Sequence, residues 1–160
     1  MLFLGNRHRV ECQTTINAVC SSARKIVVSE NVLQNKVMNG HWEHLCRQAD
    51  REIEKILGEL PTALRLRAQE LPVLFEPLPS EDLQADGIAA DTLGIFAGAE
   101  FVADGMEIMP PQIILFLENI ADYAGNDEAA FTVEVRTTFL HELGHFLGLD
   151  EGDLIDRGLE

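Results

Sequence analysis

Positive charge is scarce in this sequence of 160 residues, where 12 lysines and arginines stand against 27 aspartates and glutamates. The formal net charge is therefore −15, and no lysine or arginine lies between residues 68 and 135. Proteins bind phosphate backbones and anionic membrane surfaces through basic patches. We therefore expect no nucleic acid and no membrane among the partners of this protein.

Long apolar runs and paired cysteines are missing as well. The longest apolar run, residues 113–117, has the length of a strand and falls far short of the roughly 18 residues that a membrane helix needs. The three cysteines are odd in number and include no CxxC pair, so neither a disulfide framework nor a zinc ribbon is predicted. The apolar residues 1–4 are too few for the core of a signal peptide. We therefore expect a reducing, cytoplasmic setting.

Residues 1–37 differ from the rest of the chain, because their apolar residues are isolated and follow no sustained period. Five of the 12 basic residues lie in this segment. We predict a poorly ordered N-terminal extension over residues 1–37 and a folded domain over residues 38–160. The alternative is that residues 25–28, with the sequence Lys-Ile-Val-Val, form a short strand.

Two long segments space their apolar residues as helices do, one from His41 to Leu60 and one from about Asp127 to Leu149. The sequence between them predicts shorter elements bounded by proline or glycine. Strands are predicted at residues 72–77, 93–98, 106–109 and 112–117, and short helices at residues 62–71, from Ser80, and at residues 119–124. This order predicts an α+β fold, in which a small sheet is packed by the N-terminal helix and the long C-terminal helix.

The second long helix contains the sequence His141-Glu142-Leu143-Gly144-His145. Histidines at positions i and i+4 lie on one helix face, so both can direct a ring nitrogen at one zinc ion. Glu142 points about 100° around the helix, where it can take a proton from a zinc-bound water whose pKa is lowered to about 7. The strip around the two histidines is small or polar, whereas the opposite side of the helix is apolar. This pattern favours two zinc ligands over two histidines of the core.

The residues after the motif offer a third ligand. Gly148 lies three residues after His145 and permits the positive φ that ends a helix, so the chain can turn back toward the metal. Glu151 has the best spacing for the third ligand, and Asp150 and Asp153 are the alternatives. Three protein ligands and one water form the open zinc site that a hydrolase needs.

Residues 141–158 resemble the C-terminal part of the small bacterial zincin-like metallopeptidases, through the pattern HExxHxxGxxE and the sequence Gly-Asp-Leu-Ile-Asp-Arg-Gly that follows it. The predicted elements upstream come in the order of that family, so the resemblance covers about residues 42–158. It implies a zincin-like fold with a small mixed sheet, a zinc site, and a peptide that lies extended against an edge strand, formed by residues 112–117 or 93–98. The family usually has aspartate in place of Glu151 and often histidine in place of Phe146.

The motif and the resemblance together predict a zinc-dependent metallopeptidase that hydrolyses peptide bonds in a peptide or protein substrate. In this hypothesis His141, His145 and Glu151 hold Zn²⁺, and Glu142 is the general base. The alternative is a non-catalytic, zinc-stabilised module that binds peptides or proteins, in which four protein ligands would close the site. Hydrolysis of an amide bond other than a peptide bond also stays open.

Overall fold

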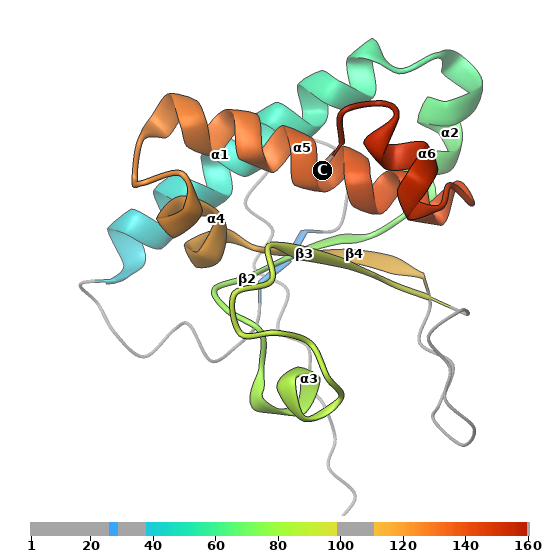
Figure 1. Ribbon diagram of the computed structural model, residues 1–160. Coiled ribbons are helices and arrows are strands. Elements are labelled where there is room, and N and C mark those ends of the chain that lie inside the picture. Colours follow the sequence, from blue (N-terminus) through green and yellow to red (C-terminus); the bar gives the residue numbers. More distant parts are fainter. Residues whose placement is uncertain (1–25, 29–37, 99–110, 160) are drawn as a thin grey trace, which may run out of the picture.

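The computed structural model describes residues 26–28, 38–98 and 111–159 (Figure 1). These residues form helices packed on one small sheet. The elements in chain order are β1 (Ile26–Val28), α1 (Met38–Glu59), α2 (Thr62–Glu70), β2 (Val73–Glu76), α3 (Glu81–Ala85), β3 (Gly94–Ala97), β4 (Gln112–Phe116), α4 (Leu117–Tyr123), α5 (Glu128–Phe146) and α6 (Glu151–Ile155).

The four strands follow the order β1-β2-β4-β3 across the sheet. β1, β2 and β4 are parallel, and β3 runs antiparallel to β4. β4 pairs on both sides, and every one of its residues is buried, as expected for a strand in the interior of a sheet whose residues 113–116 are all apolar. Residues 112–117 are therefore wrong as a candidate for the edge strand. Residues 93–98 contain β3, which lies at one edge of the sheet formed by the described strands.

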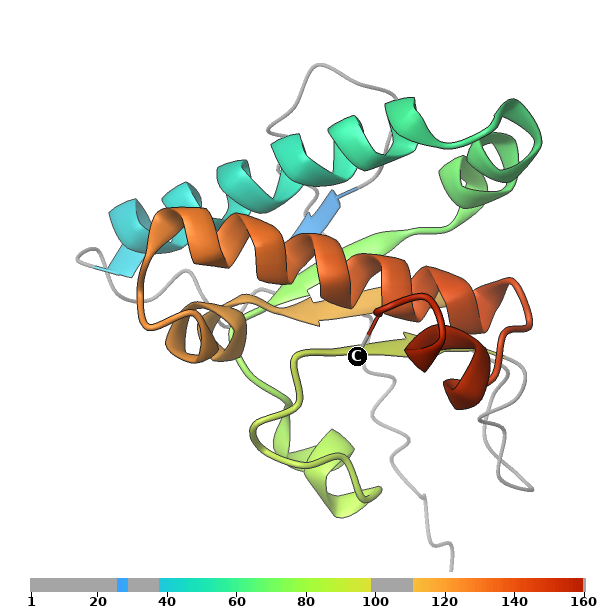
Figure 2. The same ribbon diagram turned by 45° about the horizontal axis from the view of Figure 1, so that its top comes forward.

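Helices α1 and α5 cover one face of the sheet, and α1 packs along α5 (Figures 1 and 2). The apolar core lies between these layers. α1 contributes a row of buried residues at helical spacing: Trp42, Leu45, Ala49, Ile53, Ile56 and Leu57. The predicted α+β architecture, with a helix from each end of the domain packed on a small mixed sheet, is confirmed.

Most predicted elements lie close to their expected bounds. α5 ends at Phe146, before the expected end at Leu149, because Gly148 takes the left-handed conformation with φ +85°. Within the predicted extension, residues 26–28 form β1, as the strand alternative expected. Residues 1–25 and 29–37 and the predicted strand at residues 106–109 lie outside the described residues, so the division at residue 38 stays a prediction. Among the helices that the structure describes, none is long and apolar enough to cross a membrane.

Arg136 on α5 forms ion pairs that join this helix to α1. Its Nη1 donates to Oε1 of Glu52 at 2.8 Å, and its Nη2 donates to Oε2 of Glu59. The side chain of Glu52 is only 7% exposed. Because a buried carboxylate without a cationic partner costs several kcal/mol, this ion pair matters more for stability than the exposed pairs of the surface.

We expect Arg136→Met to lower the free energy of unfolding by about 2 kcal/mol, because Lys55, at 3.7 Å, is then the remaining cation near Glu52 among the described residues. The effect is smaller than for a fully buried pair, since the Arg136 side chain is 35% exposed. Urea denaturation measures the change. Arg47→Met is the matched control, because it removes an exposed pair with Glu43 and should cost less than about 0.5 kcal/mol. Equal losses in the two variants would contradict the prediction.

Candidate metal centre

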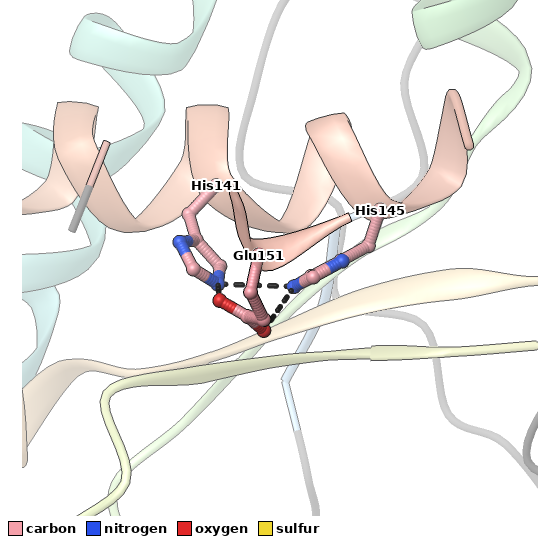
Figure 3. A group of neighbouring side chains, drawn as sticks. All are labelled: His141, His145 and Glu151. Carbon is pink, nitrogen blue, oxygen red and sulfur yellow. Dashed lines mark hydrogen bonds and ion pairs between the residues drawn. The ribbon is translucent and has the colours of Figure 1, made fainter. Parts of the chain in front are cut away.

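The two histidines of the HExxH motif lie side by side near the C-terminal end of α5 (Figure 3). Asp127 begins this helix, since its side chain accepts a hydrogen bond from the backbone N–H of Ala130 at 2.8 Å. His141 and His145 are half-buried and stand one helical turn apart, as their spacing predicts. Both rings point to the same side of the helix, toward Glu151 of α6.

Three donor groups meet at this helix face: the Nε2 atoms of His141 and His145 and the carboxylate of Glu151. The two Nε2 atoms are 3.0 Å apart, and Oε1 of Glu151 lies 3.2 Å from Nε2 of His145. Oε2 of Glu151 lies 3.8 Å from Nε2 of His141. Ligand atoms held tetrahedrally at roughly 2.0–2.1 Å from zinc are about 3.3 Å from one another. The two imidazoles and the carboxylate therefore fit a zinc ion in both spacing and donor type.

Hydrogen bonds at the other nitrogen of each ring leave Nε2 available. Nδ1 of His141 lies 2.7 Å from the carbonyl oxygen of Leu159, and Nδ1 of His145 lies 3.3 Å from that of Leu149. Because a carbonyl oxygen can only accept, each Nδ1 carries the hydrogen and donates it. Each neutral ring then presents the lone pair of Nε2 toward the other donors, as a metal ligand requires.

Glu151 reaches the histidines because the chain reverses its direction after α5. Gly148 has φ +85°, which glycine adopts without strain, so the helix ends where the sequence predicts a turn. Asp150 is the N-cap of α6, and Glu151 is the first residue of this helix. Figure 2 shows the short helix, in dark red, beside the C-terminal end of α5. Leu154 anchors α6, because it is fully buried against Gly144 of α5, where a Cβ would lie 2.4 Å from the leucine side chain. The contact between the two helices therefore requires a glycine inside the motif.

The two alternative third ligands have other partners in the structure. Oδ1 of Asp150 accepts a hydrogen bond from the backbone N–H of Asp153 at 2.9 Å. Oδ1 of Asp153 lies 3.3 Å from Nη1 of Arg157. In the part of the chain that the structure describes, the group of donors that could hold a metal ion consists of the two histidines and Glu151.

Glu142 interacts electrostatically with the donor group and with the backbone of Phe96 on β3. Its side chain is buried, and burial raises the pKa of its carboxyl above the usual range, against the opposing effect of the imidazoles of His141 and His145. A hydrogen bond from the backbone of Phe96 also favours the carboxylate and so acts to lower this pKa. A carboxyl whose pKa is raised toward neutrality suits a general base.

A glycine brings β3 close to α5. A Cβ at Gly94 would lie 2.6 Å from a side-chain carbon of α5, so larger residues would push the strand away. The Leu93 carbonyl accepts from the N–H of Phe116 on β4. Since the bonding direction alternates along an antiparallel strand, Gly94 and Phe96 direct their backbone groups away from β4. This orientation leaves the Phe96 N–H free of β4, which agrees with its effect on the pKa of Glu142.

A comparison with protein-family models identifies the family of this chain. Residues 68–159, more than half of the chain, match the family model described as zincin-like metallopeptidase. The chain belongs to this family. The predicted resemblance is thereby confirmed, and membership indicates a hydrolase of the metallopeptidase class with a zinc site. No curated protein matches the chain.

One departure of this zincin-like metallopeptidase from the family pattern has a role in packing. Phe146 stands where the family often has a histidine directly after the motif. Its ring lies 5.7 Å from that of Phe96 on β3, and the guanidinium of Arg67 on α2 lies 5.5 Å from its centre. Phe146 therefore fills the space between the edge strand and α2, and the departure leaves the three metal-binding candidates unchanged.

Two features of the metal centre are not predicted from the sequence, namely helix α6 and the carbonyl of Leu159 beside His141. The sequence contains weak indications of both features. Asp150 is a favourable N-cap residue for α6, and Gly158 suits the end of that helix. α6 has only five residues, too few to show an apolar period. The carbonyl contact depends on how the chain returns to α5, and no local pattern encodes that.

Proposed function

We propose that this protein is a zinc-dependent peptidase in which His141, His145 and Glu151 hold Zn²⁺ and Glu142 is the general base. The observation that carries the proposal is the convergence of three donor groups beside a buried carboxylate at the edge of a sheet. Three protein ligands leave one coordination position for water or substrate. That arrangement is typical of catalytic zinc sites, whereas structural sites have four protein ligands.

In the proposed hydrolysis, the bound zinc and Glu142 have different roles. Zinc, when bound, supplies a Lewis acid that polarises the scissile carbonyl and makes water more acidic. Glu142 takes the proton of the attacking water, because its carboxyl is buried and interacts electrostatically with both imidazoles of the proposed site. The same carboxyl then delivers this proton to the departing amine.

We propose the outer side of β3 as the place where an extended peptide binds. Gly94 and Phe96 direct backbone groups to this side, and no strand among the described residues pairs with it. Main-chain hydrogen bonds to such an edge hold a peptide in extended conformation whatever its side chains. A peptide or protein is therefore the proposed substrate.

The other proposed properties follow from composition. The net charge of −15 opposes binding to nucleic acids and to anionic membranes. The odd number of cysteines without a CxxC pair favours the cytoplasm. Cys46, the one cysteine that the structure describes, is no candidate nucleophile, because burial raises the pKa of its thiol to about 12.

Metal removal tests the proposed function. We expect the purified protein to cleave peptides of a mixed, internally quenched library, to lose this activity with a chelator, and to regain it with stoichiometric zinc. Fluorescence follows cleavage, and elemental analysis gives the zinc content. Bound zinc without cleavage of any peptide would favour the alternative of a zinc-stabilised binding module. Cleavage that persists in the metal-free protein would contradict the role of zinc.

A further inference from the structure

We propose that the turn at Gly158 is a positioning element of the metal centre, which places the carbonyl of Leu159 on Nδ1 of His141 and so directs Nε2 at the metal. This inference rests on the zinc site proposed above and adds to it residues beyond the far end of α6. The contact that carries it is the hydrogen bond of 2.7 Å from Nδ1 to the Leu159 carbonyl. It is shorter than the corresponding bond of His145, at 3.3 Å.

The same backbone motif supports both histidines. After α6, Gly158 has φ +70°, its N–H donates to the Ile155 carbonyl at 2.9 Å, and the Leu159 N–H donates to the Leu154 carbonyl at 3.1 Å. After α5, Gly148 and its successor make the two equivalent hydrogen bonds, each of 3.0 Å. This pair of bonds defines a helix end at a left-handed residue. In both turns, the residue after the glycine directs its carbonyl to a histidine Nδ1.

The two contacts between a histidine Nδ1 and a carbonyl differ in how far apart their residues lie in the sequence. His145 and Leu149 lie four residues apart, so their contact forms locally at the end of α5. His141 and Leu159 lie 18 residues apart, so their contact forms only when α6 is seated on α5. Leu154, which is fully buried, holds α6 in that place. The orientation of His141 thus depends on the C-terminal segment, whereas that of His145 does not.

α6 therefore contributes to the metal centre from both ends. Glu151 at its start is the proposed ligand, and the Leu159 carbonyl after its end holds a ligand in place. An imidazole without an acceptor at Nδ1 exchanges tautomers and turns about its side-chain bonds, which reduces the fraction of rings with Nε2 toward the metal. Hydrogen-bond partners of this kind contribute about 10–100-fold to metal affinity.

Gly158→Val in the full chain tests the proposal. Apart from its chain neighbours, no described residue has an atom within 4 Å of a Cβ at Gly158, so valine acts by disfavouring φ +70°. Gly158→Asn is the conservative variant, because asparagine tolerates the left-handed conformation. Gly87→Val is the matched control, because it imposes the same conflict at φ +100° with equally open space among the described residues. Gly87 follows α3, which lies away from α5 and α6 (Figure 1).

We expect competition with a chelator to show zinc affinity lowered by about 10–100-fold in Gly158→Val, lowered much less in Gly158→Asn, and unchanged in Gly87→Val. In the metal-free wild type, ¹⁵N NMR of the histidine rings should show the Nδ1–H form of His141, which Gly158→Val should convert to a mixture. Wild-type zinc affinity in Gly158→Val, or an Nε2–H form of His141 in the wild type, would overturn the proposal. If the wild type bound no zinc, the proposed function would fail, and the NMR result would still decide whether the turn orients His141.

Discussion

Glu142→Gln should abolish peptide hydrolysis while zinc binding persists. We expect turnover to fall by about 10²–10⁴-fold, the usual contribution of a general base, because the amide cannot take the proton that the carboxylate takes. The zinc affinity should stay close to that of the wild type, since the three proposed ligands are unchanged. Cleavage of a quenched peptide and elemental analysis measure the two quantities in the same samples.

Glu128→Gln is the control for this experiment, because Glu128 lies at the start of the same helix and pairs with His44. Its turnover should equal that of the wild type. The pH profile adds a second check: burial raises the pKa of Glu142, and the base works only when deprotonated, so wild-type kcat/KM should fall with decreasing pH already above the usual carboxyl range. Normal turnover in Glu142→Gln would show that another group is the base.

Glu151→Ala should weaken zinc binding by about 100-fold or more while the fold persists. Its carboxylate lies within 3.2 Å of His145 Nε2, and the loss of one of three ligands removes a large share of the binding free energy of a zinc site. The side chain is 71% exposed, so alanine at this position creates no cavity in the core. Competition with a chelator measures the affinity, and thermal unfolding of the metal-free protein shows whether the fold is kept.

Asp153→Ala distinguishes Glu151 from its neighbours. Asp153 belongs to the same short helix and pairs with Arg157, so its removal should change zinc affinity by less than about threefold. Glu151→Asp should retain part of the affinity, because it keeps a carboxylate with a shorter reach. If Asp153→Ala lost zinc as strongly as Glu151→Ala, the third ligand would have been assigned to the wrong residue.

The position of the edge strand shows where sequence reasoning fails for this fold. Residues 93–98 and 112–117 both have strand-like apolar segments, and the sequence does not say which of them pairs on both sides. Pairing is decided by contacts between strands, and the order β1-β2-β4-β3 is not the order along the chain. The apolar run at residues 113–117 is consistent with an interior strand, since both faces of β4 are buried, but it does not identify the strands that pair with it.

By itself the sequence determined the α+β class, the two long helices, and the placement of His141 and His145 on one helix face, because helical periodicity and capping act over a few neighbouring residues. The end of α5 near Gly148 is of the same kind, since it needs only one residue that adopts a positive φ. Only the tertiary structure decided that β3 forms the edge beside the motif, that Glu151 rather than a neighbouring aspartate meets the histidines, and that Leu159 reaches His141. These contacts join different elements of the fold, and their geometry is set by close packing of the core and by strand pairing, which local residue preferences do not encode.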